Sequence, residues 1–276
     1  MRKLFLIGCA ALVGACGGGG NNNNNNGGNN GTPGLKTFSY GSPAAPTQQQ
    51  QNTANKAQTQ LGSATNATLN NQVSGAASLP TLTDTLANSL PASLMAVPGD
   101  PELISDGPAS FLARHSGALS GNCVQVNQST ITYSNCSITS TGLTETINGT
   151  LSAASGTSTW NLTVTWDYSG SGITENGTYN WTGQLVFTGT TIIGQGRSTF
   201  TGHYTGSGYT VDYAYTAGFD SNLSYTTTSS FCIAGGTLEI RRTLNSTTNS
   251  QVAPVHDAGA KYNWTGCGAV TVQKGT

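Results

Sequence analysis

The chain has 276 residues, of which only 8% are charged, and its formal net charge at pH 7 is −1. So small a net charge provides no long-range attraction for polyanions, which excludes nucleic acid as an expected partner. The first part of the chain has too few apolar residues to build a core, so the length predicts one main folded body.

The amino terminus has the three parts of a bacterial export signal. A cationic start, Met1 to Lys3, precedes an apolar stretch, Leu4 to Val13, that is too short to span a bilayer. The run Leu12-Val13-Gly14-Ala15-Cys16 then resembles the lipobox of bacterial lipoproteins. The resemblance covers only these residues, and it implies removal of a signal peptide, residues 1–15, and lipid modification of Cys16. Acyl chains on Cys16 would anchor the mature protein.

Two other interpretations of this terminus remain open. Leu6-Ile7-Gly8-Cys9 matches the same pattern, although cleavage there would leave an apolar core of about half the usual length. An ordinary secretory signal with an incidental cysteine would also place the protein outside the cytoplasm. Position 17 is Gly rather than Asp, which in lipoproteins implies the outer membrane. We therefore expect a lipid-anchored protein of the cell outer membrane, on its periplasmic face or at the cell surface.

A Gly/Asn-rich segment follows the signal. Residues 16–43 include a Gly run and an Asn run with no apolar side chain to offset the entropy of ordering, so we predict a disordered tether.

Residues 44–118 are predicted to be a low-complexity, partly helical segment. Four leucines recur there at spacings of three and four, which predicts one amphipathic helix from about Pro80 to just before Pro91. They are Leu79, Leu82, Leu86 and Leu90. Such a short helix must dock its leucines against the rest of the protein to be stable.

Residues 119–276 are predicted to be an antiparallel β domain. Apolar and polar residues alternate with period two; between Trp160 and Tyr168, Trp, Leu, Val and Tyr alternate with Asn, Thr and Asp. This alternation predicts about nine to eleven strands in a mainly β fold, a curved sheet or barrel with one aromatic face. A transmembrane barrel is the less favoured alternative, because Gly183, Gly202 and Gly206 interrupt the apolar positions.

Five aromatic residues are candidates for contact with a ligand: Trp160, Trp166, Trp181, Tyr213 and Tyr215. If exposed, they could form a stacking platform for sugar rings or peptide. If buried, they are the core. Their alternation with Thr and Asn favours the core.

The cysteines test the strand assignment. Four remain after Cys16, an even number that suits an oxidising compartment: Cys123, Cys136, Cys232 and Cys267. Three pairings are possible, and sequence order favours Cys123 with Cys136 and Cys232 with Cys267. If Cys123 and Cys136 oppose each other, Val126 faces Tyr133 and apolar side chains meet. Residue parity then places all four sulfurs on polar faces. No CxxC or HxxxH spacing supports a metal site.

Catalytic motifs are missing from the sequence. It has no Gly-x-Ser-x-Gly elbow, no phosphate-binding loop ahead of a helix and no His-Glu-x-x-His. His256 and Asp257 are neighbours in a loop and seldom point at each other in such a position, and His203 falls on the polar face of its strand. Glu239 and Arg241 predict a surface ion pair. We expect no catalytic residue, cofactor or metal.

Arg242 falls on the opposite face of its strand from Arg241. It could lie at an edge of the sheet or enter a pocket, and an edge is the expected place because an arginine there can keep its charged head in water.

These observations predict a cell-envelope lipoprotein whose β domain is a non-enzymatic structural or binding module. One alternative is a β-barrel carrier for an apolar ligand or glycan, which a cavity lined by Trp181 and Tyr213 would favour. A second is an envelope hydrolase, which a cleft containing His256 or two facing carboxylates would favour. The expected partners are the membrane, through the anchor at Cys16, and a glycan, an apolar ligand or an envelope protein.

Overall fold

The computed structural model describes residues 35–77, 79–80, 82, 86, 90, 122–140, 142–206, 208–228, 230–248 and 257–275. The predicted signal peptide, Cys16 and His256 lie outside the described residues. None of the helices in the described ranges is both long enough and apolar enough to cross a membrane.

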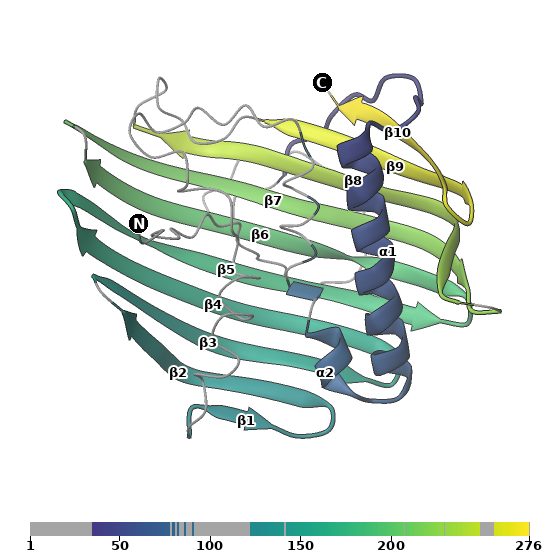
Figure 1. Cartoon of the computed structure of the whole chain (residues 1–276), viewed down its shortest axis with the longest axis horizontal. Helices are drawn as coiled ribbons and strands as arrows, with labels where there is room; N and C mark the ends of the chain where they lie inside the picture. The colour runs from purple at the N-terminus through teal and green to yellow at the C-terminus, as the bar shows by residue number, and fades with distance from the viewer. Residues whose placement is uncertain are drawn as a thin grey trace, which may run out of the picture.

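One antiparallel sheet of ten strands forms most of the structure (Figure 1). The strands follow one another across the sheet in chain order: β1 (Val124–Val126), β2 (Thr130–Ser140), β3 (Leu143–Ala154), β4 (Thr157–Gly170), β5 (Ile173–Thr188), β6 (Thr191–Gly206), β7 (Tyr209–Thr226), β8 (Cys232–Thr247), β9 (Ala258–Gly266) and β10 (Ala269–Gly275). The predicted class and number of strands are confirmed.

The barrel alternative is wrong, because the sheet is open and β1 and β10 are its two edges. Closure would require these strands to pair with each other. β1 has only three residues. The outer edge of β10 is already bonded to the chain that precedes the helix: the Gly41 N–H donates to Lys274 O over 3.1 Å, and the Ala44 N–H donates to Val272 O over 3.0 Å. The edge that a barrel would need is therefore occupied.

Helices cover one face of the sheet, which we call the inner face (Figure 1). α1 (Gln48–Leu69) begins at a capping box in which the Gln50 N–H donates to the Thr47 hydroxyl and the Thr47 N–H donates to the Gln50 side chain. α2 (Val73–Ala76) follows it. The sequence did not predict α1 as a defined helix, since its buried side is made mainly of Ala and Thr rather than of large apolar residues.

The four leucines beyond α2 are buried, as their spacing predicts. Leu79, Leu82 and Leu86 are helical, and all four leucines have at most 1% of their surface exposed. They belong to the same core cluster as the apolar side of α1 and the rings of the sheet. Their burial satisfies the requirement that this segment dock its leucines against the β domain.

Aromatic rings of the sheet fill the inner face, as the alternation predicts. Trp160 is 2% exposed and Trp181 is fully buried. The Tyr179 ring stacks on Trp181 with centroids 5.7 Å apart, and its centroid lies 4.6 Å from that of Trp166. Ring contacts of this kind add to the free energy gained by burial alone.

Two glycines make room for the largest rings. Gly183 lies opposite Trp160, and a Cβ atom at Gly183 would be 2.0 Å from a ring carbon of that indole. Gly177 lies opposite Trp166, where a Cβ atom would be 2.2 Å from the ring. The glycines that interrupt the alternation in the sequence therefore let indole rings lie against the backbone of the next strand.

Both predicted disulfides are present, Cys123–Cys136 and Cys232–Cys267. The predicted register and the polar position of the first pair are wrong. Val124, not Val126, pairs with Tyr133, and Cys136 is fully buried in the core cluster. A β-bulge causes the change: between Tyr133 and Cys136, two residues of β2 face one residue of β3, and Asn135 takes a φ of 51°. One extra residue reverses which side of a strand the later side chains face.

The contact between Trp160 and Gly183 generates a stability prediction. Gly183→Ala should lower the free energy of unfolding by about 1–3 kcal/mol, because the new methyl group overlaps the indole in a filled core. Urea denaturation followed by tryptophan fluorescence measures this change. Gly266→Ala is the matched control, since a Cβ atom there meets nothing within 4 Å; it should change stability by less than about 0.5 kcal/mol. Equal stability of the two variants would contradict the packing argument.

Candidate functional site

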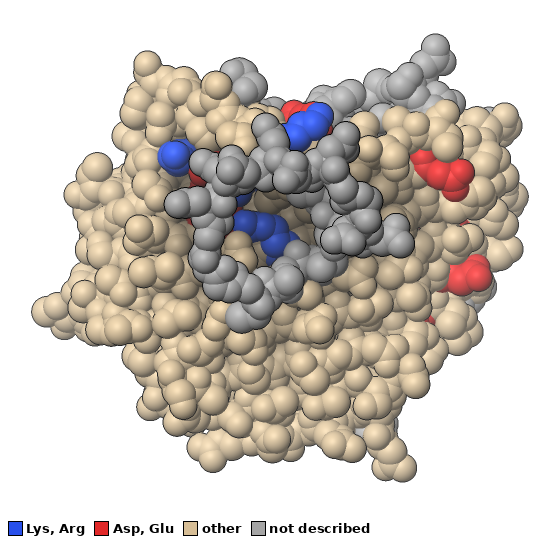
Figure 2. Space-filling model, turned by 180° about the vertical axis from the view of Figure 1, so that it is seen from behind, with Lys and Arg blue, Asp and Glu red and all other residues tan. Residues whose placement is uncertain are grey.

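The outer face of the sheet carries an ordered array of uncharged polar side chains. Strand registers align one row of hydroxyls across five strands: Ser137, Thr146, Thr165, Thr178 and Thr201. The next row contains two amides and three hydroxyls: Asn148, Thr163, Asn180, Thr199 and Thr216. Within it, the Thr163 hydroxyl donates to Asn180 over 2.9 Å, and the Asn180 amide donates to Thr199 over 3.5 Å. Figure 2 shows this face, where much of the described surface has no charged side chain.

A shallow pocket of about 380 Å³ opens on this face over β5, β6 and β7. Its polar side chains are Asn176, Thr178, Thr201, His203, Asp212 and Ser246. Tyr213, one of the aromatic candidates from the sequence, also lines it, together with Ala214 and two glycines. The pocket offers both hydrogen-bond donors and acceptors, and its volume is at the lower end of the range for small-molecule sites.

His203 and Asp212 meet across the β6–β7 hairpin at one side of the pocket. His203 Nδ1 lies 2.6 Å from Asp212 Oδ1, and His203 Nε2 lies 3.2 Å from the Thr205 hydroxyl. Carboxylate, imidazole and hydroxyl thus follow one another in the order of a hydrolase triad.

This arrangement is better suited to binding than to catalysis. The side chains of His203 and Asp212 are 39% and 59% exposed, so water screens the pair. The Thr205 hydroxyl, which would have to be the nucleophile, is not among the groups that line the pocket, and it also lies 3.0 Å from the Thr210 hydroxyl. A bound molecule in the pocket would therefore meet the imidazole and the carboxylate but not an activated hydroxyl.

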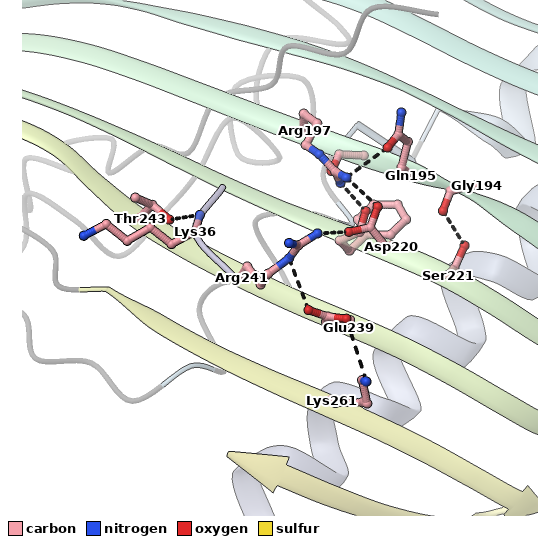
Figure 3. A network of polar contacts seen from close by, with 12 residues as sticks. Lys36, Gly194, Gln195, Arg197, Asp220, Ser221, Glu239, Arg241, Thr243 and Lys261 are labelled. Carbon is pink, nitrogen blue, oxygen red and sulfur yellow. Dashed lines mark hydrogen bonds and ion pairs between the residues drawn. The ribbon is translucent and has the colours of Figure 1, made fainter. Parts of the chain in front are cut away.

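Charged side chains gather on a second part of the outer face, over β6 to β9 (Figure 3). Asp220 is shared by two arginines, which bind its two oxygens: Arg197 binds Oδ1 and Arg241 binds Oδ2. Arg241 Nε lies 3.3 Å from Glu239 Oε1, and Lys261 Nζ lies 3.9 Å from Glu239 Oε2. The predicted pair of Glu239 and Arg241 is thus one contact in a larger network.

Gly218 allows this network to form. It lies between Arg197 on β6 and Arg241 on β8 in the strand register. A Cβ atom at Gly218 would be 2.9 Å from the Arg197 side chain. With no side chain in the way, Arg197 reaches across and donates to Phe219 O over 2.6 Å. The backbone carbonyl of Phe219 therefore helps to hold the Arg197 guanidinium in the position from which it binds Asp220.

Residues 35–44, which we call the strap, lie over the same part of the outer face. The Lys36 N–H donates to the Thr243 hydroxyl over 3.0 Å, and the Lys36 ammonium pairs with Asp257. The Tyr40 hydroxyl donates to Glu239 over 2.8 Å. Burial, together with this hydrogen bond, raises the pKa of Tyr40 well above its ordinary value, so the phenol remains a neutral donor. The sequence assigned residues 35–43 to the tether, but here they pack on the sheet.

The five aromatic candidates all lie on the inner face. Trp160, Trp166, Trp181 and Tyr215 are buried, and Tyr213 is half-buried with its ring stacked on Phe200 at 4.9 Å. The four buried rings form the core, whereas Tyr213 packs against the core and also lines the outer-face pocket.

Arg242 also points to the inner face, and the expectation that it lies at an edge is wrong. It pairs with Ala217 in the middle of the sheet and is 6% exposed. Burial lowers the pKa of its guanidinium from the ordinary value.

The pocket was not predicted, although one sequence signal could have located it. His203 and Asp212 are equidistant from the turn of the β6–β7 hairpin, and both fall on the polar side of their strands. An antiparallel hairpin with this turn therefore places the two residues opposite each other. Asn176 and Ser246 join the pocket from the neighbouring strands β5 and β8. Predicting this would require the registers of those strands, which no local sequence pattern gives.

Comparison with known proteins gives no match: no family model, curated protein or solved structure is significantly similar to this chain. Within the part of the chain that the structure describes, no group of three or more His, Cys, Asp or Glu residues could hold a metal ion.

The shared carboxylate generates a second stability prediction. Asp220→Asn should lower the free energy of unfolding by about 1–2 kcal/mol, because Arg197 and Arg241 would remain side by side without their common counter-charge. Their side chains are only 18% and 17% exposed. Asp167→Asn is the control on an exposed position of the same face and should stay within about 0.5 kcal/mol of the wild type. Equal losses in urea denaturation would show that the network contributes nothing special.

Proposed function

We propose that the chain is a lipid-anchored protein of the cell envelope and that its β domain is a non-enzymatic binding module. The lipobox-like run before Cys16 supports the anchor, and the two disulfides suit an oxidising compartment. The Gly/Asn-rich segment before the strap gives the domain distance from the lipid surface.

The outer-face pocket is the proposed binding site, and a neutral glycan is the proposed ligand. The carrying observation is the chemistry of the lining: hydroxyls, one amide, one imidazole and one carboxylate surround about 380 Å³ of open space. Such short groups pair with the hydroxyls of a sugar, each of which both donates and accepts. The surrounding rows of Thr and Asn extend the same chemistry beyond the pocket and suit a chain of sugars rather than a single ring.

Lipid anchoring is tested by metabolic labelling with a palmitate analogue in a Gram-negative host. The wild type should carry label and sediment with membranes, whereas Cys16→Ser should lose the label. Cys9→Ser is the matched control and should keep its label. Label that is lost with Cys9→Ser instead would move the anchor to that position, and an unlabelled wild type would leave only a secretory signal.

Glycan binding is tested by calorimetry with two classes of neutral oligomer, glucans and chitin oligomers. We expect one of these classes to bind and His203→Ala to weaken its binding at least tenfold, since the imidazole lines the pocket and holds Asp212 in place. Asp167→Asn, on the same face but outside the lining, should bind within twofold of the wild type. The proposal fails if none of these probes binds, or if both substitutions weaken binding equally.

A further inference from the structure

The outer-face pocket lies at one end of a longer line of side chains. Strand registers align seven residues across β2 to β8, which we call the pocket row: Ser137, Thr146, Thr165, Thr178, Thr201, Ala214 and Ser246. The four members on β5 to β8 line the pocket. The three members on β2, β3 and β4 carry hydroxyls, so the same hydrogen-bonding chemistry continues from the pocket towards the β1 edge of the sheet.

The hydroxyls of the pocket row are available to a ligand. Most members of the row are exposed, and none of those that carry a hydroxyl is buried. Three of these hydroxyls have no hydrogen-bond partner among the described residues: Thr165, Thr178 and Thr201. Each can therefore donate one hydrogen bond and accept others.

The neighbouring row is less available, because its members bond to one another. Thr163 donates to Asn180, and Asn180 donates to Thr199. Thr199 and Thr216, at the end of this row beside the pocket, are also buried. A ligand that extends from the pocket across the strands would therefore follow the pocket row.

The spacing of the pocket row suits an extended chain of sugars. Neighbouring strands lie about 4.8 Å apart, which is close to the length of one sugar ring in an extended chain. Thr165, Thr178 and Thr201 stand on consecutive strands, so consecutive rings can each reach one hydroxyl. A β-1,4-linked chain of hexopyranoses is extended and presents hydroxyls along its edges. An α-1,4-linked chain coils, and it would leave the row after a short distance.

We propose that the outer face binds an unbranched β-1,4-linked glycan, with one end in the pocket and the rest along the pocket row over β4, β3 and β2. This inference rests on the proposed function and adds the linkage, the direction and the length of the bound chain. The sugars in the pocket meet His203 and Asp212. The later sugars meet the hydroxyls of Thr165, Thr146 and Ser137. Each of these hydrogen bonds is weak, so affinity depends on how many sugars reach the row.

Chain length and linkage are tested by calorimetry with oligomers of β-1,4-glucan, chitin and α-1,4-glucan, from disaccharide to hexasaccharide. In at least one β-linked series, affinity should rise at least tenfold from disaccharide to hexasaccharide, because the longer chain reaches hydroxyls beyond the pocket. The α-linked hexasaccharide should bind at least tenfold more weakly than this β-linked one. Equal affinity for short and long oligomers, or α-linked binding as tight as β-linked binding, overturns the inference but not the proposed pocket. If no oligomer binds, both proposals fail.

A substitution far from the pocket tests the path of the chain. Thr146→Val removes a hydroxyl of the pocket row two strands away from β5 while keeping the shape of the side chain. It should weaken binding of the β-linked hexasaccharide three- to tenfold but hardly affect the disaccharide, which does not reach β3. His203→Ala in the pocket should weaken the binding of both.

Thr150→Val is the matched control for Thr146→Val. Thr150 is an exposed threonine on the same strand and the same face, but it lies outside the pocket row. The control should bind both oligomers within twofold of the wild type. The inference is overturned if Thr146→Val and Thr150→Val have equal effects on the hexasaccharide, or if Thr146→Val weakens both oligomers equally.

Discussion

Large apolar side chains fill one side of the strands, and water must be kept from that side. Side chains along each strand point alternately to the two faces of the sheet. Between Trp160 and Tyr168 every second residue is buried, without exception. A single antiparallel sheet can leave one side in water, but the other must find a partner. Here the partner comes from the same chain, as α1, α2 and the four leucines that follow, so the fold depends on a segment whose own sequence gives it little tendency to be helical in isolation.

The two faces consequently carry different chemistry. Ring contacts and glycine spaces fill the inner face, whereas threonine and asparagine rows cover the outer face. Of the ten Lys and Arg and eleven Asp and Glu residues in the chain, three of the former and two of the latter meet in the network around Asp220. That concentration leaves most of the rest of the outer face neutral. A neutral face of short side chains is hydrated without repelling or attracting ions, which suits recognition through many weak hydrogen bonds.

Sequence alone predicted the fold where residue parity is unbroken. From β4 to β7 the alternation gave the correct inner residues, and the order of the cysteines in the sequence led to the correct pairs. The prediction failed where one extra residue reverses the face to which the later side chains point, as at Asn135 in β2. Amino-acid composition does not reveal such a bulge. The prediction also misplaced Arg242, since a charged residue next to an apolar row is more often found at an edge than inside.

The helix and the pocket show two other limits of sequence. The buried side of α1 consists mainly of alanine and threonine, whose small side chains produce no clear apolar period in the sequence. The pocket gathers residues from four strands, and only the His203–Asp212 pair is local enough to be found from one hairpin. The strap was assigned to the Gly/Asn-rich tether, although Phe38 and Tyr40 lie against Gly259 and Gly275.

Occupation of the β10 edge by residues 40–44 affects how these molecules behave when crowded. A bare edge strand exposes a row of amide and carbonyl groups that can recruit the same strand of a neighbouring molecule and begin a continuous fibre. Gly41 and Ala44 already bond to that row, and a glutamine side chain, Gln273, also donates to Gly41 O. Packed side by side on a surface, such chains would remain separate units instead of fusing through this edge into an aggregate.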